Sequence, residues 1–224
     1  MRTHFSMTTN SISAKFPGLE DVADSSLLHE AMGRRGAMSH EIKSIYPGAK
    51  VIGQALTVRC VAGDNLMLHV AISIAKPGDV LVATMDGFTE AGAWGEIASL
   101  AAQLRGIRGV VLDGAARDVD ATSRLNFPVF ARGVSIKGTT KRQRGSLNKP
   151  ITIGDVHVCP GDIVVGDVDG VVVVPLAEVS DIIAKAKALK KKEELIMQKL
   201  REGASTLDLL GLRPVLTELG LDRE

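Results

Sequence analysis

The chain has 224 residues, of which 45% are hydrophobic and only 3% are aromatic. Its 27 Lys and Arg residues nearly balance its 26 Asp and Glu residues, which leaves a formal net charge of +1. This balance argues against nucleic acid or an anionic membrane as the principal partner, and the shortage of aromatic rings argues against a base-stacking platform. The length is sufficient for one large domain with its own core.

The N-terminal segment, the lack of long apolar stretches and the cysteines indicate the cellular compartment of the protein. Residues 1–16 are polar and lack the apolar run of a signal peptide, so we expect them to be frayed. No stretch approaches the roughly 20 apolar residues that span a bilayer. Cys60 and Cys159 have no metal-ligand spacing; we expect them to be buried and reduced, although a disulfide between them stays possible. These features predict a soluble cytoplasmic protein with a single domain over residues 17–224.

In chain order, the first half alternates between helical and strand-like segments. Gly33 is placed to end a first helix, and Asp64 is placed to cap the next one. Apolar residues at helical spacing, from Trp94 through Ile97 to Leu104, then precede a fully apolar strand. We predict helices over 21–33, 64–75 and about 94–104, and strands over 51–61, 79–85 and 109–114. This alternation is typical of α/β units.

The second half is mostly strand until the C-terminus. We predict strands within 127–136, 150–158 and 161–175, separated by Gly, Pro and Asp turns. Their apolar and polar residues alternate poorly, so we expect cover on both faces. A long helix follows over about 177–202, and a weaker helical tail ends near 221. The whole chain indicates one domain with mixed sheets and a C-terminal helical arm.

A first candidate site joins a helix start to a charged turn. Amides at the start of a helix have no partner within it, so those of Gly95, Glu96, Ile97 and Ala98 favour a small anion such as a carboxylate. Arg117 and Asp118 follow the apolar strand directly. A guanidinium suits a carboxylate or an enolate oxygen, and a carboxylate suits a hard divalent cation. The alternative is an ordinary surface turn that carries a charged pair.

Glu193 is a second candidate because it interrupts an apolar stripe of the long helix. The stripe steps by four and three residues through Ile182, Ala186, Leu189, Glu193, Ile196 and Leu200. A carboxylate in such a stripe should be paired, or should face a site or a neighbouring chain. The alternative is an edge residue whose carboxylate reaches solvent.

Other motifs are weaker. His69 lies among apolar residues and is expected to be a hydrogen-bonded structural histidine rather than a base. Lys137 and Lys141 could reach an anion, but a flexible basic loop is the favoured interpretation. No dinucleotide fingerprint, P-loop, HExxH or GxSxG motif is present in the sequence.

Four segments together resemble the regulator of ribonuclease activity A-like family, which includes divalent-metal 4-hydroxy-4-methyl-2-oxoglutarate aldolases. They are WGEIASLAAQLRGIRGVVLDGAARDVD, PVFARGVSIKGTT, PGDIVVGDVDGVVVVP and REGASTLDLLG. The Gly-Glu, Asp-Gly-Ala and Arg-Asp elements have the family's order and spacing. The resemblance extends from about residue 20 to 212, nearly the whole chain.

The resemblance implies a fold, an assembly and a site. The fold would be a three-layer β/β/α arrangement of the swivelling-domain kind, assembled as a trimer or hexamer with sites between subunits. Asp118 would ligate Mg²⁺, Mn²⁺ or another divalent cation, and Glu96 would contact it through water. Arg117 and the amides of residues 95–98 would bind a 2-oxo acid. Glu193 of a neighbouring subunit would complete the site, again through water.

Two departures from the aldolase pattern leave the substrate open. An acid is expected three positions after Asp118, where this chain has Ala121, and Asp120 stands one residue early. Glu96 occupies a position where Asp is more usual. In contrast, the ribonuclease-inhibiting branch lacks an Asp after the Arg, and this chain keeps it, which favours an enzyme.

The sequence thus predicts a class II, metal-dependent aldolase. It would cleave a 4-hydroxy-2-oxo acid, such as 4-hydroxy-4-methyl-2-oxoglutarate, to pyruvate, and the same chemistry would decarboxylate oxaloacetate. One alternative keeps the site but acts on another 2-oxo or hydroxy acid. The other is a non-catalytic, protein-binding regulator of the ribonuclease E type.

Overall fold

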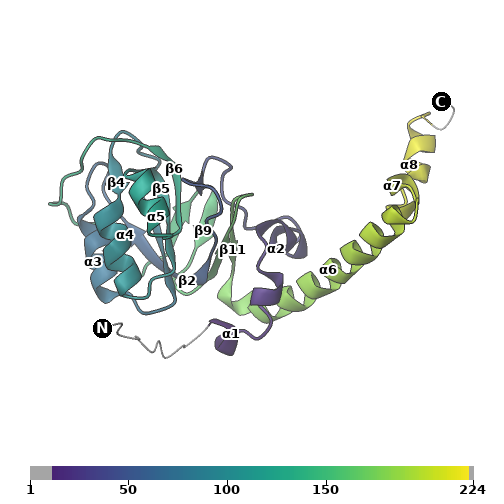
Figure 1. The fold of residues 1–224 in the computed structure, drawn as a ribbon, viewed down its shortest axis with the longest axis horizontal. Coiled ribbons are helices and arrows are strands. Elements are labelled where there is room, and N and C mark those ends of the chain that lie inside the picture. The colour runs from purple at the N-terminus through teal and green to yellow at the C-terminus, as the bar shows by residue number, and fades with distance from the viewer. Residues whose placement is uncertain (1–11, 222–224) are drawn as a thin grey trace.

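The computed structural model describes residues 12–221, which form a mixed sheet, a separate hairpin and flanking helices. Figure 1 shows a body built around the sheet, with the helix α6 projecting from it. The nine strands of the sheet are β1 (Lys43–Ser44), β2 (Val51–Arg59), β3 (Asp79–Thr84), β4 (Gly92–Trp94), β5 (Gly109–Ala116), β6 (Val129–Val134), β7 (Ser146–Leu147), β10 (Ile163–Gly166) and β11 (Val171–Val174). The hairpin is β8 (Ile151–Ile153) and β9 (Val156–Val158).

The described helices fall into two groups along the chain. Those up to residue 124 are α1 (Ile12–Lys15), η1 (Glu20–Val22), α2 (Ser25–Ala31), α3 (Leu66–Ile74), α4 (Glu96–Leu104) and α5 (Val119–Arg124). Those at its C-terminal end are η2 (Leu176–Glu178), α6 (Val179–Arg201), α7 (Thr206–Leu209) and α8 (Arg213–Glu218). None of the described helices is long and apolar enough to cross a membrane.

The sheet has a parallel centre and antiparallel edges. Its order is β1-β6-β5-β3-β2-β10-β11, with β4 paired to β5 and β7 paired to β2. Strands β2, β3, β5 and β6 run parallel. Every residue of β10 and β11 is buried, which agrees with the predicted cover on both faces. The same prediction was wrong for β8 and β9, because Thr152 and His157 are exposed on one face of their hairpin.

Three layers follow from what packs on each face. One face meets α3 and α4 through a core that includes Trp94 and Phe127, whose rings stack with centroids 5.9 Å apart. The other face meets the β8–β9 hairpin, whose Ile151 and Ile153 share a core with Val80 of β3. The predicted three-layer β/β/α fold is therefore confirmed. The outer face of the hairpin is open, because Thr152 and His157 are exposed.

A third apolar cluster joins the long helix to the sheet. Ile182 and Ala186 of α6 are buried against α2 and β11. Beyond this cluster α6 is exposed, with Leu195 and Met197 about half accessible to solvent. The predicted helix over about 177–202 is confirmed as α6, and Figure 1 shows α7 and α8 continuing the predicted arm.

Several predicted boundaries were wrong for local reasons. The first predicted helix begins at Ser25 rather than at residue 21. Asp24 is its N-cap, because the Asp24 carboxylate accepts a hydrogen bond from the Leu27 amide at 2.9 Å. The cap position of α3 is Asn65, although Asp64 binds the Leu66 amide at 2.9 Å.

The helix predicted near 94–104 differs in its start and its buried face. Trp94 belongs to β4, and α4 begins after Gly95. Ile97 and Leu104 are 78% and 79% exposed, whereas the face toward the sheet is made of Ala98, Ser99 and Ala102. Small residues on that face let α4 pack closely, so the apolar spacing predicted the helix but not its core side.

The terminal and cysteine predictions can be judged in part. Residues 12–15 form α1, and Ile12 and Phe16 pack against the third cluster, so this part of the predicted frayed segment is ordered. The rest of that segment, residues 1–11, lies outside the described residues. Both cysteines are free, as expected. Burial raises the pKa of Cys60 to about 12, whereas Cys159 is only partly buried.

Candidate functional site

The charged pair stands where β5 ends and α5 begins. The Arg117 amide donates to the Trp94 carbonyl at 2.7 Å, which fixes the end of β5 beside β4. Asp118 has φ 53° and ψ 42°, a left-handed conformation that is unusual for a residue with a side chain. Its carbonyl accepts from the Thr122 amide at 2.9 Å, so α5 begins directly after it. Strain of this kind is typical of functional positions.

The two predicted halves of the site meet at the start of α4. The Asp118 Oδ2 atom accepts from the Glu96 amide at 3.1 Å and lies 3.4 Å from Arg117 Nε. A Cβ atom on Gly95 would overlap Asp118 Oδ2, so only glycine permits this approach. The Arg117 and Asp118 side chains stay 42% and 40% exposed. The turn therefore presents a partly exposed, ion-paired carboxylate rather than a buried one.

A pocket of about 240 Å³ opens beside this pair. Its wall includes five predicted site residues, namely Gly95, Ile97, Ala98, Arg117 and Asp118. The side chain of Glu96 is exposed and is not part of the wall. Its backbone amide is engaged by Asp118, so this amide is not free for a ligand carboxylate in the structure.

The wall also contains His69 of α3 and its cap residue Asn65, neither of which was predicted to belong to the site. Asn65 Nδ2 donates to the Ala93 carbonyl at 2.8 Å, which leaves Asn65 Oδ1 buried without a hydrogen-bond partner. His69 Nε2 is also buried without a partner, so the prediction of a hydrogen-bonded structural histidine was wrong. Burial lowers the pKa of His69, and the charge of Lys141 lowers it further. The only sequence signal that Asn65 and His69 lie side by side was their separation of four residues, from the cap of α3 to its first turns.

Glu193 lies elsewhere within its own chain. It lines a separate pocket of about 450 Å³ between α2, η1 and α6, together with Asp21, Glu30 and Lys190. It is exposed, whereas Ile182 of the same stripe is buried. A single chain therefore does not bring Glu193 to Asp118, and its contribution to a neighbouring subunit stays a prediction.

The described residues include no group of three or more His, Cys, Asp or Glu side chains that could hold a metal ion. This does not conflict with a magnesium-type site, because Mg²⁺ keeps several water ligands and uses one or two carboxylates with its substrate. The half-exposed carboxylate of Asp118 has only one amide and one guanidinium on Oδ2. Its donor chemistry fits a hard divalent cation.

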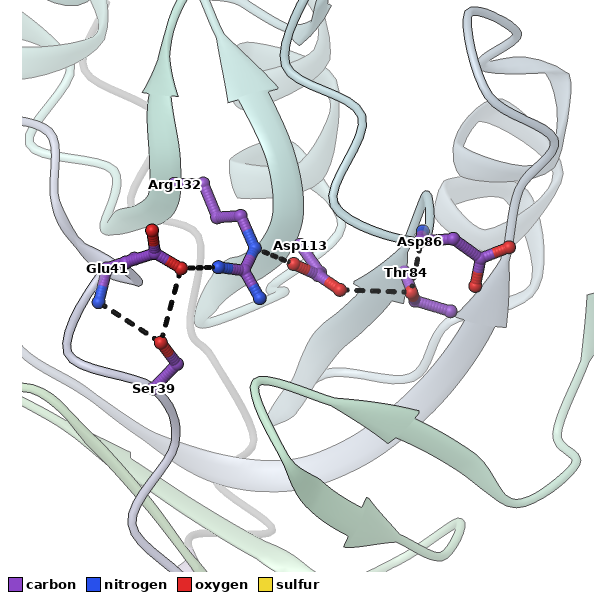
Figure 2. Close-up of polar contacts among 6 residues, drawn as sticks. All are labelled: Ser39, Glu41, Thr84, Asp86, Asp113 and Arg132. Carbon is purple, nitrogen blue, oxygen red and sulfur yellow. Dashed lines mark hydrogen bonds and ion pairs between the residues drawn. The ribbon is translucent and has the colours of Figure 1, made fainter.

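Figure 2 shows a second charged network, which links side chains of β3, β5 and β6. Arg132 of β6 binds both Asp113 of β5 and Glu41. Asp113 Oδ2 accepts from the Thr84 hydroxyl at 3.3 Å, which links β3 to the network. The pKa of Arg132 is raised, chiefly by its hydrogen bond to Asp113. In this network one guanidinium is shared by two carboxylates, and none of its residues lines the pocket beside Asp118.

Comparisons with known proteins identify relatives in sequence and in fold. A chain of Halalkalibacterium halodurans, named "Putative 4-hydroxy-4-methyl-2-oxoglutarate aldolase", is 36% identical over 182 residues, which cover 81% of this chain and 84% of that one. The structure of an uncharacterized protein from Pseudomonas syringae matches with a TM-score of 0.78 and 28% identity, over 88% of this chain and 96% of that one. The RNA-processing inhibitor RraA from Thermus thermophilis matches with a TM-score of 0.63 and 25% identity, over 68% of this chain and 92% of that one.

The family model described as RraA-like, Aldolase/RraA, matches residues 19–173. That range contains Gly95, Arg117 and Asp118, the whole pocket wall beside them, and every strand of the sheet except the last residue of β11. The sequence resemblance to this family is thereby confirmed, and the chain belongs to the RraA-like (Aldolase/RraA) family.

Proposed function

We propose that this protein is a divalent-metal-dependent aldolase that cleaves a 4-hydroxy-2-oxo acid to pyruvate. The observation that carries the proposal is the pocket beside Asp118, where a carboxylate, a guanidinium and a helix start converge. The similarity to the H. halodurans protein supports an aldolase, because that protein's name states this activity. The substrate we favour resembles 4-hydroxy-4-methyl-2-oxoglutarate.

Each residue has a chemical task in this proposal. Asp118 would hold Mg²⁺, Mn²⁺ or another divalent cation, with Glu96 reaching it through water. When bound, the cation would supply Lewis-acid polarisation of the 2-oxo acid. Arg117 would bind the pyruvate portion and stabilise the negative charge that develops on the enolate oxygen. The free amides at the start of α4 would orient the substrate carboxylate.

The same enolate explains a second activity. Cleavage of the C3–C4 bond of a 4-hydroxy-2-oxo acid leaves the electron pair on pyruvate, and the hydroxyl proton leaves as the aldehyde or ketone forms. Loss of carbon dioxide from oxaloacetate leaves the same pyruvate enolate, which then takes a proton. A site that stabilises this one anion should therefore also decarboxylate oxaloacetate.

We further propose that the active form is a homotrimer or hexamer. Ile97 and Leu104 expose an apolar face of α4, and the arm exposes Leu195, Met197 and Leu219. Exposed apolar surface of this extent is typical of interfaces. In such an assembly, Glu193 of a neighbouring subunit would approach the cation through water.

The experiment is a pyruvate-release assay with oxaloacetate and with 4-hydroxy-4-methyl-2-oxoglutarate, with Mg²⁺ and then with chelator. We expect chelator, Arg117→Ala and Asp118→Ala each to reduce turnover by at least about 100-fold. Arg34→Ala is the matched control, because Arg34 forms an exposed ion pair with Glu30 outside the pocket. Full activity of either pocket variant in chelator would refute the proposal.

A second candidate function is protein-binding regulation of a ribonuclease. The similarity to the Thermus thermophilis inhibitor favours it, as does the exposed arm. A regulator would use its outer surface, so Asp118→Ala should leave ribonuclease inhibition intact. Inhibition of ribonuclease E without pyruvate release would favour this candidate.

A further inference from the structure

The basic loop, defined here as residues 137–145, forms part of the pocket wall. Gly138, Thr139 and Lys141 line the pocket together with Arg117 and Asp118. The sequence predicted a flexible loop because it is rich in Lys, Arg, Gly and Thr. Its position is instead fixed from the start of α3, which belongs to the same wall.

The fixing group is the carboxylate of Asp64, whose residue is only 1% exposed. Its Oδ2 atom accepts from the Thr140 hydroxyl at 2.7 Å, the Arg142 amide at 2.6 Å and the Gln143 amide at 3.2 Å. Its Oδ1 atom accepts from the Leu66 amide at 2.9 Å. One buried side chain therefore joins the basic loop to the first turn of α3.

Backbone contacts hold the same junction. The Thr140 amide donates to the Gly63 carbonyl at 2.9 Å, and the Asn65 amide donates to the Thr140 carbonyl at 3.0 Å. A Cβ on Gly145 would overlap the Arg59 carbonyl, so the far end of the basic loop packs directly on β2. Burial raises the pKa of Asp64, but the donors around it outweigh burial and hold the pKa at about 2. The carboxylate is thus ionised whenever the protein is folded near neutral pH.

Lys141 is the cation that this arrangement brings to the pocket. Lys137 of the same loop is paired with Glu90 at 2.6 Å, whereas Lys141 makes no ion pair within residues 12–221. Arg117 is already partly neutralised by Asp118. The pocket therefore contains a second, uncompensated positive charge, which is suited to a second anionic group on a ligand.

We propose that Asp64 is a positioning residue, which holds the basic loop so that Lys141 binds an anionic group of the substrate other than the one bound at Arg117. The inference rests on the proposed function, because it assumes that a 2-oxo acid occupies this pocket. Lys141 is then the residue that distinguishes a substrate with an anionic distal group from one without it. Asp64 does not touch the substrate.

The first arm of the test needs no substrate. Trypsin cleaves after Lys141, Arg142 and Arg144, so cleavage in the basic loop reports how firmly it is held. Asp64→Asn keeps the size of the side chain but removes its negative charge and one acceptor oxygen, and we expect cleavage at least about tenfold faster than in the wild type. Thr140→Val is a milder variant that removes a single donor to Asp64. We expect intermediate cleavage.

Asp167→Asn is the matched control for this arm. Asp167 is also buried, and it accepts from the Ser25 amide at 2.8 Å and the Ser25 hydroxyl at 2.6 Å. It does not line the pocket or bind the basic loop. General destabilisation would therefore accelerate cleavage equally in both variants, whereas a specific role of Asp64 would not.

The second arm separates positioning from structure. With oxaloacetate and Mg²⁺, we expect Asp64→Asn and Lys141→Met each to raise KM about tenfold with kcat within about twofold, and the double variant to go no further. Exchange of the pyruvate methyl protons should keep its wild-type KM, because pyruvate has no distal anion. Lys137→Met, on the same loop, should change neither.

Distinct results decide each claim. Unchanged cleavage in Asp64→Asn, an unchanged KM in Lys141→Met, or multiplied effects in the double variant would overturn the inference. If the wild type neither decarboxylates oxaloacetate nor exchanges pyruvate protons, the proposed function fails together with the role of Lys141. The cleavage comparison with Asp167→Asn still decides whether Asp64 holds the loop.

Discussion

Asp64 and Asp118 are carboxylates that each precede the first turn of a helix near one pocket, and Asp118 lines that pocket whereas Asp64 holds the basic loop that lines it. Their oxygens are used very differently. Asp64 is buried and accepts four hydrogen bonds, three of them from the basic loop. Asp118 is half-exposed and accepts from one amide, with Arg117 beside it. A carboxylate whose oxygens are all engaged holds structure together, whereas one with free oxygens can bind a ligand.

The largest expected effect on activity comes from removing the carboxylate of Asp118, which has free oxygens. Asp118→Gly should reduce kcat/KM for oxaloacetate by about 1000-fold, because the proposed cation loses its direct ligand. The same variant should unfold at an equal or higher temperature, since glycine relieves about 1 kcal/mol of left-handed strain. Thermal unfolding and kinetics on one preparation measure both. A variant that loses activity only because it unfolds would break the comparison.

Gly95→Ala should give the next largest effect. The added Cβ would overlap Asp118 Oδ2 and also crowd the Arg117 side chain, so both must move. We expect kcat/KM to fall by about 100-fold, because a small displacement of reacting groups is costly. Gly133→Ala is the control, since a Cβ there has open space. Equal kinetics of the two variants would argue against the close approach.

Asp64→Asn should also lower the free energy of unfolding, in addition to its expected effect on KM. The shift of its pKa from 3.8 to about 2 corresponds to about 2 kcal/mol of unfolding free energy above pH 4. Because the folded pKa is depressed, this contribution is complete above 3.8 and is lost as the pH falls toward 2. Denaturant unfolding between pH 5 and 2 should show a smaller acid-dependent loss in the variant. Parallel pH profiles would contradict the assignment.

The smallest effect should come from His69. Burial lowers its pKa, so its neutral form is favoured in the folded state. Above its ordinary pKa of 6.5 this has no cost, but below 6.5 the unfolded chain binds the proton first and stability falls. His69→Gln should therefore show a shallower decline in melting temperature from pH 7 to pH 5. An unchanged slope would mean that another group causes the decline.

The sequence predicted the parts of the site that are local in the chain. Arg117 and Asp118 directly follow an apolar strand, and Gly95 directly precedes a helix, so short-range patterns were enough. The fixed position of Lys141 was missed because it depends on Asp64, which is 76 residues before Thr140. No periodicity reports that a buried carboxylate joins two such distant segments.

The fold shows the same division between local and distant information. The strands with near-continuous Val, such as β11, were predictable because full burial leaves a plain apolar run. The buried side of α4 was not predictable from hydrophobicity, because Ala98, Ser99 and Ala102 pack inward while Ile97 and Leu104 face outward. Hydrophobic spacing alone therefore does not tell which side of α4 packs on the sheet of the same chain.

The most direct measurement is the binding of Mn²⁺, monitored by the electron paramagnetic resonance signal of the ion with and without pyruvate. The wild type and Asp64→Asn should both bind Mn²⁺, and pyruvate should alter the bound signal. Asp118→Asn should remain folded and lose the binding, because the carboxylate with free oxygens is gone. Equal Mn²⁺ binding by Asp118→Asn and the wild type would contradict the account.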